Sequence, residues 1–386
     1  MNRAADSASL DSDLHRALRT VESSGSRIRI DGRDLLNFAS NDYLGLAHDA
    51  RVIEAAQHAL LTWGTGAGAS SLVTGWTSLH QQCAETLADW LGYDTAVIAP
   101  SGFAANCAAI TAVVGEQDVV VADQRNHASL IDACRATNAR VRHYRHGDVD
   151  HARALLERAE SDQPKRIVTD AVFSMDGTIA PLVELARLAE EFDAMLIVDE
   201  AHGTGVIGPE GRGASAAGHI DARVDLHIGT FSKALGAQGG FIAGSQALID
   251  RVINRGRSFI YSTALTPAMV AAALQAVTII RSEPERNERR AEHVRQIRAA
   301  LGAQGWTIEG VDEAPMIAVI IGEADHAVRA ASTLADHGIH APAIRPPTVR
   351  PGTSRIRLAP MATHSADDVR QVVQAFANVR QDVASE

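Results

Sequence analysis

The sequence of 386 residues contains little cysteine, which limits the structures that cysteine chemistry could support. Its three cysteines are Cys83, Cys107 and Cys134, and no two of them form a Cys-x-x-Cys pair. Neither a disulfide framework nor a zinc site is expected, because both need several cysteines at short, regular spacings. We predict that the three side chains lie in the core and that the protein binds no metal.

Clustered positive charge is also missing from the sequence. The formal net charge is -11, and no long run of lysine or arginine occurs. Proteins that bind nucleic acid neutralise its phosphates with clustered basic side chains. The composition therefore argues against a nucleic-acid partner.

The sequence shows neither a targeting segment nor a membrane span. Its first twenty residues, "MNRAADSASLDSDLHRALRT", are polar and acidic and lack the apolar block of a secretory signal. The longest mostly apolar stretch, residues 264–280, contains Pro267 and Gln275, and it predicts a buried helix rather than a membrane-spanning one. We therefore expect a cytoplasmic protein with no membrane partner.

Apolar residues are plentiful and make up 46% of the chain. A chain of this length and composition can form a large core and by default folds into two domains. Between residues 96 and 245, short apolar runs such as "AVIAP", "DVVVAD" and "MLIVD" alternate with amphipathic segments. This alternation predicts an α/β domain whose mainly parallel sheet is covered on both faces.

The pattern changes after about Pro284, where a long charged segment is followed by shorter strand and helix patterns. This change predicts a smaller α+β domain. Ser365 and Asp368 have the spacing of a capping box and predict the start of the final helix. We therefore divide the chain into an N-terminal segment (1–45), a large α/β domain (46–284) and a small α+β domain (285–386).

Several residues with polar groups follow directly after the predicted strands of the large domain. In an open α/β sheet, ligands bind beyond the carboxyl ends of the strands, so these residues are expected to face one crevice. They are Ser101, Gly102, Phe103, His127, Ser174, Asp199, His202, and Thr230 to Lys233.

The segment "GTFSKALGAQGG", Gly229 to Gly240, gives this crevice a candidate nucleophile. Lysine side chains are normally solvated. Lys233, however, lies between hydroxyl residues and glycines, and glycines leave room for a ligand or for a second backbone. An amine in such a crevice can form an imine with a carbonyl compound.

Two further motifs offer an anion-binding segment and an acid. "SGFAAN" follows a strand and opens a helix, so the backbone N–H groups of Gly102 and Phe103 can bind an anion, although an ordinary helix cap also explains this motif. "VDEAHGTG" ends a strand with Asp199, Glu200 and His202. A buried carboxylate there needs a cationic partner, and a structural role for Asp199 and His202 explains the motif equally well.

Together these groups match the requirements of pyridoxal 5'-phosphate, which we predict as the cofactor. This cofactor needs a lysine that forms a Schiff base, a carboxylate that keeps the pyridine nitrogen protonated, and a phosphate site. Lys233, Asp199 and the "SGFAAN" segment supply these three, and His127 adds a flat ring.

A series of motifs runs through nearly the whole chain: "NFASNDYLGL", "LVTGWTSLHQQCAETLADWLGY", "SGFAAN", "RNHASLIDACR", "VFSMDGTIAPL", "VDEAHGTGVIGPEGRG", "GTFSKALGAQGG", "STALTP" and "RPPTVRPGTSRIRL". With these motifs the sequence resembles the α-oxoamine synthases, a family of fold-type I pyridoxal-phosphate enzymes. Within the family it is most similar to the branch that acts in biotin biosynthesis. The resemblance implies the fold of that family, a large α/β domain and a smaller α+β domain.

The resemblance also implies a role for each residue of the crevice. Lys233 would form the Schiff base, Asp199 would pair with the pyridine nitrogen, and His202 would hydrogen-bond the ring hydroxyl. With His127, which would stack on the ring, these are the implied catalytic residues. Further cofactor contacts are implied for Gly102, Phe103, Ser174 and Thr230 and, across a homodimer interface, for Ser262 and Thr263.

The segment "SRIRL" predicts the binding site of the substrate carboxylate. Strand alternation places Arg355 and Arg357 on one face, opposite Ile356 and Leu358. We predict that Arg357 binds the carboxylate, because a guanidinium can bind it with two hydrogen bonds and the resemblance indicates the second arginine of the pair. The resemblance implies further substrate contacts for Asn41, His127, Thr348 and Arg19, with Arg16 as the alternative to Arg19.

The implied reaction is a decarboxylative condensation of L-alanine with a pimeloyl thioester, carried by coenzyme A or by an acyl-carrier protein. The alternatives are acetyl transfer to glycine, as in the glycine C-acetyltransferases of the same family, or the reaction of another α-oxoamine synthase. Alanine and glycine differ by one methyl group, which motif spacing does not distinguish. Ser70 and Ser71 stand where many relatives have Ser-Arg, so acyl-chain recognition stays open.

Two other functional classes are disfavoured. The segment "GTGAGA", Gly64 to Ala69, fits a nicotinamide-binding fingerprint, but it follows a predicted helix instead of the strand that this fingerprint needs. A non-catalytic binding protein is disfavoured because every polar group of the expected site is present.

Overall fold

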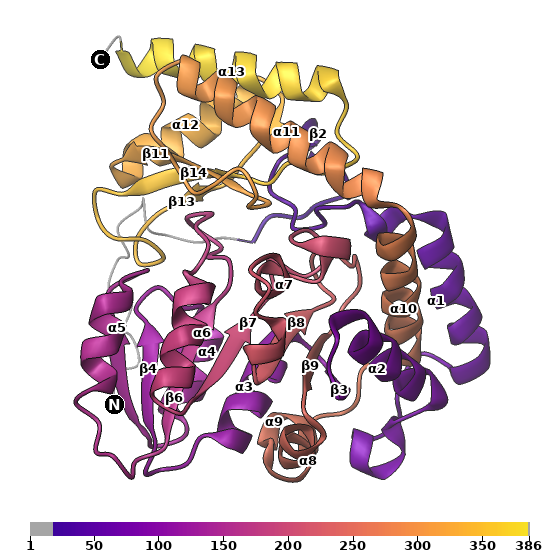
Figure 1. Ribbon diagram of the computed structural model, residues 1–386. Helices are drawn as coiled ribbons and strands as arrows, with labels where there is room; N and C mark the ends of the chain where they lie inside the picture. Colours follow the sequence, from indigo (N-terminus) through magenta and orange to yellow (C-terminus); the bar gives the residue numbers. More distant parts are fainter. Residues whose placement is uncertain (1–17, 385–386) are drawn as a thin grey trace, which may run out of the picture. The chain divides into compact units, whose positions relative to one another are not determined.

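A computed structural model describes residues 18–384, which form two compact units (Figure 1). The large unit consists of Leu44–Ser174 and Thr178–Asn287. The small unit consists of the described residues up to Tyr43, of Met175–Gly177, and of the residues from Glu288 onward. The small unit is therefore formed by residues that come before the large unit in the sequence and by residues that follow it.

Seven strands form the central sheet of the large unit: β3 (Thr95–Ala99), β4 (Val119–Asp123), β5 (Arg140–Tyr144), β6 (Lys165–Asp170), β7 (Ala194–Asp199), β8 (Leu226–Thr230) and β9 (Gly240–Gly244). Their order is β3-β9-β8-β7-β6-β4-β5. Only β9 runs antiparallel to its neighbours, β3 and β8, and the other adjacent strands are parallel. The mainly parallel sheet predicted from the sequence is confirmed.

The strands of this sheet carry apolar side chains on both faces because both faces are covered. In β4, for example, residues 119–121 are completely buried valines, as expected for a parallel strand between two layers of helices. The helices of the large unit are α1 (Ala50–Trp63), α2 (Ser78–Leu91), α3 (Gly102–Val113), α4 (Ala128–Arg135), α5 (Val149–Leu156), α6 (Leu182–Glu191), α7 (Ala214–Ala217), α8 (Gln246–Arg255), α9 (Arg257–Ile260) and α10 (Pro267–Ser282).

Two sequence predictions concern helices α1 and α10. The apolar stretch 264–280 largely forms α10, and most residues of this helix are buried. No helix within residues 18–384 is long and apolar enough to cross a membrane. The segment Gly64 to Ala69 follows α1, not a strand, so the context required for a nicotinamide-binding fingerprint is missing.

The cysteines lie where the sequence predicted. Cys83 and Cys134 are buried, Cys107 is half-buried, and all three are free thiols. Burial raises the pKa of Cys83 and of Cys134 to about 12. These thiols are therefore unreactive core residues, since the thiolate is the nucleophilic form.

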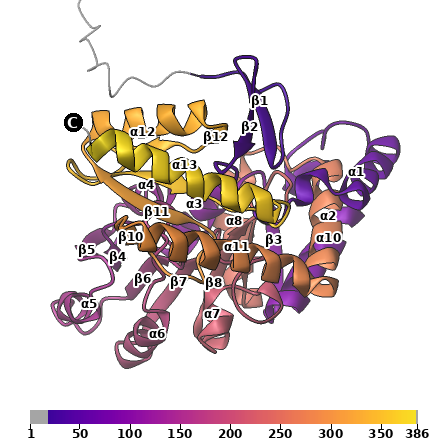
Figure 2. The ribbon, with the colours of Figure 1, turned by 90° about the horizontal axis from the view of Figure 1, so that it is seen from above.

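The small unit contains two sheets and three long helices (Figure 2). Strands β1 (Arg27–Ile30), β2 (Arg33–Asn37) and β12 (Ile339–His340) form one sheet. The other sheet has the order β10-β11-β14-β13, with β10 (Ile308–Glu309), β11 (Ile317–Gly322), β13 (Ala343–Ile344) and β14 (Ser354–Leu358). Both views show that this second sheet is covered on one side by α11 (Pro284–Ala303), α12 (Ala324–Asp336) and α13 (Ala366–Ala384).

Two local predictions for the small unit are confirmed. The N–H of Asp368 donates to Oγ of Ser365 at 3.2 Å, and the N–H of Ser365 donates to Oδ2 of Asp368 at 2.8 Å. This reciprocal pair is the capping box at the start of α13. Along β14, Ile356 and Leu358 belong to the core of the unit, and the two arginines between and before them have polar partners instead.

Candidate active site

Four titratable side chains follow or end the parallel strands of the large unit at their carboxyl ends. His127 follows β4, Asp170 and Asp199 are the last residues of β6 and β7, and Lys233 follows β8. Asp170 and Asp199 are register partners in neighbouring strands. Burial is the main influence on the pKa of His127 and of Asp170, and the charges of Asp199 and Lys233 act on both groups in addition. The four side chains thus form one electrostatic cluster.

Asp199 is a buried acid held by neutral donors. Its Oδ1 accepts a hydrogen bond from the N–H of Ala201 at 2.8 Å, and its Oδ2 accepts one from Nδ2 of Asn106 at 2.6 Å. Asp199 is only 5% exposed. A carboxylate in such surroundings is stabilised by a cationic partner. Asp199 is therefore suited to bind a protonated nitrogen of a ligand.

Asp170 is the second buried acid of the cluster. Its Oδ2 accepts a hydrogen bond from the N–H of His127 at 2.6 Å, and its own N–H donates to Oδ1 of Asn126 at 3.0 Å. Burial, reinforced by the negative charge of Asp199, raises the pKa of Asp170 well above its ordinary value. Asp170 consequently holds a proton more readily than an isolated aspartate does.

His127 is the N-cap residue of α4 and is exposed on one side. Its Nδ1 accepts a hydrogen bond from the N–H of Ser129 at 3.2 Å and lies 2.7 Å from Oγ of Ser129. Partial burial of the ring lowers the pKa of His127; the charge of Lys233 lowers it further, and that of Asp199 opposes this shift. The lowered pKa favours the neutral form of the ring, and its flat face can stack on an aromatic ligand.

Lys233 lies in a tight turn between β8 and β9. The N–H of Gly236 donates to the carbonyl of Lys233 at 2.9 Å. Gly236 has φ of 64°, and a Cβ there would come within 2.3 Å of the backbone nitrogen of Ala47. As expected from the sequence, the glycine of this turn allows a second segment of backbone to approach closely.

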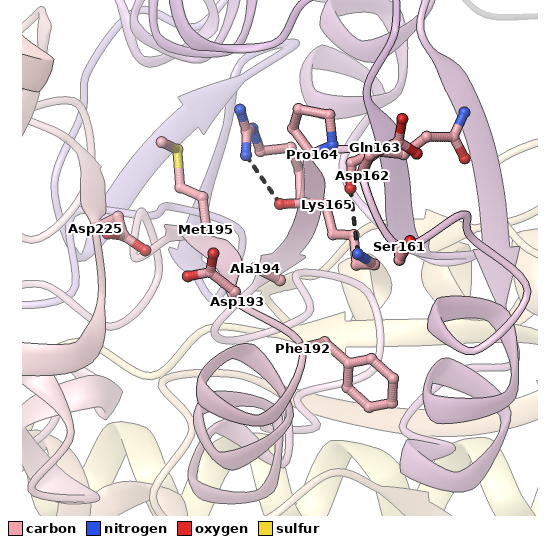
Figure 3. A pocket seen from close by; sticks show the side chains of 11 residues that line it. Ser161, Asp162, Gln163, Pro164, Lys165, Phe192, Asp193, Ala194, Met195 and Asp225 are labelled. Atoms are coloured by element: carbon pink, nitrogen blue, oxygen red, sulfur yellow. Dashed lines mark hydrogen bonds between the residues drawn. The ribbon is translucent and has the colours of Figure 1, made fainter.

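The chain has only two lysines, and the other one, Lys165, lies at the opposite end of β6. Figure 3 shows Lys165 in a surface pocket with several acidic side chains, where its Nζ donates to the carbonyl of Gln163 at 3.2 Å. The carboxyl end of β6 lies about 17 Å away, from the rise per residue of a strand. Of the two amines, only Lys233 belongs to the cluster with Asp199 and His127.

The start of α3 has the features of an anion site. The N–H groups of Gly102 and Phe103 precede the first intrahelical hydrogen bonds, and the helix dipole favours negative charge there. A Cβ on Gly102 would lie 3.2 Å from Oγ1 of Thr230, so the hydroxyl of Thr230 is directly beside this helix start. Ser101 also caps the helix by accepting from the N–H of Ala104 at 3.1 Å. The two explanations of the motif are therefore compatible.

The other predicted cofactor residues also lie in the large unit. His202 is 6% exposed in the turn after β7, and Ser174 is half-buried four residues after the end of β6. Ser262 and Thr263 lie between α9 and α10, where Thr263 forms an isolated β-bridge with Ser70. Their roles in binding the cofactor remain predictions.

The predicted carboxylate-binding residue belongs to a hydrogen-bonded cluster in the small unit. Nη2 of Arg357 donates to Oδ1 of Asn41 at 3.0 Å and to the hydroxyl of Tyr43 at 3.3 Å. Arg355 instead pairs with two acids, Asp176 and Glu309. The neighbouring arginines of β14 therefore differ: Arg355 pairs with two acids, whereas Arg357 donates to Asn41 and Tyr43.

The remaining predicted substrate residues lie on the surface of the small unit. Arg19 and Thr348 are both exposed residues of the small unit. Arg16, the alternative to Arg19, lies outside the described residues. A substrate role for Arg19 and Thr348 stays a prediction.

Several site residues escaped the sequence analysis. Asp170 could have been found by the rule that found Asp199, because it also ends an apolar strand. Asn106 is a polar residue in the otherwise apolar helix segment "GFAANCAAITAVV", which is a weaker signal. Ser129 and Tyr43 gave no signal, because their importance depends on tertiary neighbours.

Comparisons with known proteins show the family of the chain. The model of the class I and II aminotransferase family matches residues 33–376. The chain is 43% identical to an 8-amino-7-oxononanoate synthase of Geobacter metallireducens, with 95% of this chain and 94% of that protein covered. It is 41% identical to 8-amino-7-oxononanoate synthase 2 of Bacillus subtilis, with 97% and 95% covered.

A solved structure gives the same result for the fold. A serine palmitoyltransferase from S. paucimobilis, solved with a bound PLP–myriocin aldimine, superimposes with a TM-score of 0.93 at 29% identity. The similarity covers 96% of this chain and 94% of that one. The chain is thus similar along its length to an enzyme of known structure that binds pyridoxal phosphate.

Proposed function

Because the chain belongs to the class I and II aminotransferase family, we propose that it joins L-alanine to a pimeloyl thioester with the help of pyridoxal phosphate. The products are 8-amino-7-oxononanoate, carbon dioxide and the free thiol carrier, and the reaction is a step of biotin biosynthesis. The observation that carries this proposal is the identity of 41% and 43% to 8-amino-7-oxononanoate synthases, over more than nine-tenths of each chain.

The chemistry of the donor groups in the large unit fits this cofactor. Lys233 supplies an amine for its aldehyde, and Asp199 is a buried acid suited to its protonated ring nitrogen. The start of α3, beside Thr230, suits its phosphate. Bound there, pyridoxal phosphate supplies a carbonyl group that captures the substrate amine and a ring that accepts the electrons released at the substrate's α-carbon.

Asp199 keeps a proton on the ring nitrogen of the cofactor. Its negative charge favours the protonated nitrogen, and hydrogen bonds from Ala201 and Asn106 fix both carboxylate oxygens. Because these donors are neutral, they orient the carboxylate without replacing the ring nitrogen as its cationic partner. We propose that His202 hydrogen-bonds the ring hydroxyl of the cofactor and that His127 stacks on its ring. Ser174 is a further cofactor contact.

Lys233 moves the protons of the reaction. With the cofactor bound, the amine of Lys233 would act as a general base and remove the α-proton of alanine. The resulting carbon attacks the thioester carbonyl, and the C–S bond breaks to release the thiol carrier. Loss of carbon dioxide then leaves a carbon that takes up a proton, which the protonated Lys233 can supply.

Arg357 binds the carboxylate of the amino acid in this proposal. Its guanidinium is oriented by two neutral acceptors, Asn41 and Tyr43, and a planar guanidinium binds a carboxylate with two hydrogen bonds. Binding by the carboxylate matters because the bond that breaks must stand perpendicular to the cofactor ring. We assign Asn41 and His127 to the same substrate, Arg19 to the acyl substrate, and Thr348 to a further substrate contact.

We also propose that the enzyme is a homodimer. Five large apolar residues of the large unit are strongly exposed: Leu61 (88%), Leu72 (53%), Val73 (72%), Phe103 (49%) and Tyr261 (73%). Four of these residues, all except Leu61, lie on segments that are hydrogen-bonded to one another. The N–H of Ala264 donates to the carbonyl of Ala69 at 3.0 Å, and Oγ of Ser258 donates to the carbonyl of Ala104 at 2.7 Å. Large exposed apolar groups on neighbouring segments are typical of an interface. Ser262 and Thr263, which follow Tyr261, would reach the phosphate of the cofactor in the second subunit.

The proposed reaction is tested by product analysis. The purified protein with pyridoxal phosphate is given L-alanine, glycine or L-serine, each with pimeloyl, acetyl or palmitoyl thioesters, carried by coenzyme A or by acyl-carrier protein. We expect 8-amino-7-oxononanoate from L-alanine and a pimeloyl thioester to form fastest. Faster reaction of glycine with acetyl-CoA, or no product from L-alanine with either pimeloyl thioester, would contradict the proposal.

A further inference from the structure

Two buried polar side chains, Asn106 and Ser129, connect Asp199 to His127. Nδ2 of Asn106 lies 2.6 Å from Oδ2 of Asp199 and 2.8 Å from Oγ of Ser129. Oγ of Ser129 in turn lies 2.7 Å from Nδ1 of His127. All four residues belong to the large unit. Asp199 ends β7, Asn106 lies in α3, Ser129 lies in α4, and His127 is the N-cap residue of α4.

The direction of the hydrogen bonds from Asn106 is fixed by its neighbours. The carboxylate of Asp199 can only accept when ionised, so the NH2 group of Asn106 must face it. The same NH2 group has a second hydrogen, which it donates to Oγ of Ser129. This orientation leaves Oδ1 of Asn106 without a partner within residues 18–384. A lost hydrogen bond is the cost of the arrangement, and it shows that the carboxylate determines the orientation.

The direction of the next hydrogen bond is fixed by the backbone of Ser129. Its N–H donates to Nδ1 of His127 at 3.2 Å, and an N–H group cannot accept. Nδ1 therefore carries no proton. The Ser129 hydroxyl, which already accepts from Asn106, has its own hydrogen available and must donate it to the same Nδ1.

We propose that Asn106 and Ser129 are positioning residues that hold His127 as the neutral tautomer with its proton on Nε2. Neither residue touches the cofactor in this proposal. Both act through the two side chains that do, Asp199 and His127. The hydrogen bonds run outward from the NH2 group of Asn106. One is donated to Asp199, and the other is donated to Ser129, whose hydroxyl donates in turn to His127.

Burial and backbone contacts make this arrangement rigid. Asn106 is 2% exposed and Ser129 is completely buried, so water does not compete for their hydrogen bonds. The N–H of His127 is held by Oδ2 of Asp170 at 2.6 Å. The backbone of His127 is therefore held in place, and the N–H and hydroxyl of Ser129 hold its imidazole through Nδ1.

The consequence for catalysis rests on the proposed function. Asp199 favours a positive charge on the cofactor ring, and a positively charged imidazole stacked on that ring would repel it. The ring needs an ionised Asp199 and an uncharged His127. Asn106 favours both, because it donates to Asp199 directly and acts on His127 through Ser129. The Nε2–H group is then available as a donor to the carboxylate or thioester oxygen of a substrate.

The tautomer can be measured directly by NMR of the protein labelled with ¹⁵N-histidine, with and without pyridoxal phosphate. The His127→Gln variant assigns the resonances of His127. Near pH 7 we expect an unprotonated Nδ1 and a protonated Nε2 in the wild type. A protonated Nδ1, or protons on both nitrogens, would overturn the proposal. This readout does not depend on turnover, so it separates a wrong network from a wrong proposed reaction.

Variants test which residues fix the tautomer. In Ser129→Ala the two nitrogen shifts of His127 should move toward each other as the second tautomer becomes populated, and Asn106→Leu should act in the same direction. We expect about a tenfold loss of kcat/KM in Ser129→Ala, as for one lost hydrogen bond, and recovery to within about threefold of wild type in Ser129→Thr.

Thr204→Val is the matched control. It removes a hydroxyl from another buried imidazole, because Oγ1 of Thr204 lies 3.1 Å from Nε2 of His227 in the same unit. The His127 shifts and kcat/KM should stay at wild-type values in this variant. Unchanged His127 shifts in both Ser129→Ala and Asn106→Leu would overturn the proposal, as would equal changes in Thr204→Val.

Discussion

At the scale of single residues, position decides function more than residue type does. Lys233 shares a cluster with Asp199 and His127, whereas Lys165 donates to a backbone carbonyl at the far end of a strand. The arginines of β14 differ in the same way. Arg355 is neutralised by Asp176 and Glu309, and Arg357 is oriented by neutral groups.

Arg357 can be tested by comparing a conservative with a drastic substitution. Arg357→Ala should raise the KM for L-alanine by about a hundredfold, and Arg357→Lys by about tenfold, because an ammonium keeps the charge but loses the two-pronged geometry. Steady-state kinetics with both substrates measure this. A raised KM for the thioester with an unchanged KM for L-alanine would contradict the assignment.

His227 predicts a pH dependence of stability. It is completely enclosed between Tyr93 and Phe241, and burial lowers its pKa to about 3. Between this value and the ordinary value of about 6.5, the unfolded chain binds a proton that the folded chain does not. The contribution of the neutral His227 to the free energy of unfolding is therefore complete above pH 6.5, its ordinary pKa, and is lost as the pH falls toward the pKa of about 3 in the folded protein.

The expected loss is about 1.4 kcal/mol in free energy of unfolding for each pH unit within this window. Urea unfolding of wild type and of His227→Phe between about pH 4 and pH 7 checks it. The variant should show the shallower decline toward low pH, whatever its absolute stability. Equal slopes for the two proteins would contradict a neutral, buried His227.

The residues of the site were predictable to different degrees. Asp199, His127 and Lys233 follow apolar strands, and strand ends are readable from hydrophobic patterning. Asn106 and Ser129 owe their importance to hydrogen bonds between α3, β7 and the start of α4. No pattern in the sequence shows which helix residues will face one another, so these contacts appeared only in the structure.

At the scale of elements, the central sheet was predictable because buried parallel strands are continuous apolar runs. The order of its strands was not, since β9 is inserted between β3 and β8 and hydrophobic patterning does not specify neighbours. The hairpin of β1 and β2 was overlooked, although Asp31-Gly32 is a strong turn signal. Both residues have the positive φ, 51° and 74°, that such a turn requires.

The turn that carries Lys233 depends on Gly236. Gly236→Ala should destabilise the protein by roughly 2–4 kcal/mol, because φ is 64° and the new Cβ would clash with the backbone at Ala47. Gly302→Ala is the matched control: this glycine lies within α11, and a Cβ added to it would have no neighbouring atom within 4 Å. It should be neutral or slightly stabilising. Thermal unfolding that ranks the two variants in the opposite order would refute this account of the turn.

At the scale of the whole molecule, the two compact units have different tasks in the proposed function. The large unit holds the cofactor residues, and the small unit holds Arg357, Asn41 and Tyr43. The exposed apolar residues of the large unit are the basis for proposing a homodimer. Ser262 and Thr263 then become the test of whether the active sites are shared between subunits.

Mixed dimers provide that test. Lys233→Ala and the double variant Ser262→Ala/Thr263→Ala should each be nearly inactive at low cofactor concentration. After unfolding and refolding together in equal amounts, they should recover about a quarter of wild-type activity, because half of the dimers are mixed and each has one intact shared site. Mixing without subunit exchange is the control. No recovery in refolded mixtures that contain mixed dimers would show that Ser262 and Thr263 serve their own subunit.

The most direct test of the central claim is the site at which the cofactor is attached. The yellow protein with pyridoxal phosphate is reduced with borohydride, digested and analysed by tandem mass spectrometry. Because the chain has only two lysines, Lys165 serves as the internal control. We predict a pyridoxyl adduct on Lys233 and none on Lys165. An adduct on Lys165 alone, or on neither lysine, would contradict the account.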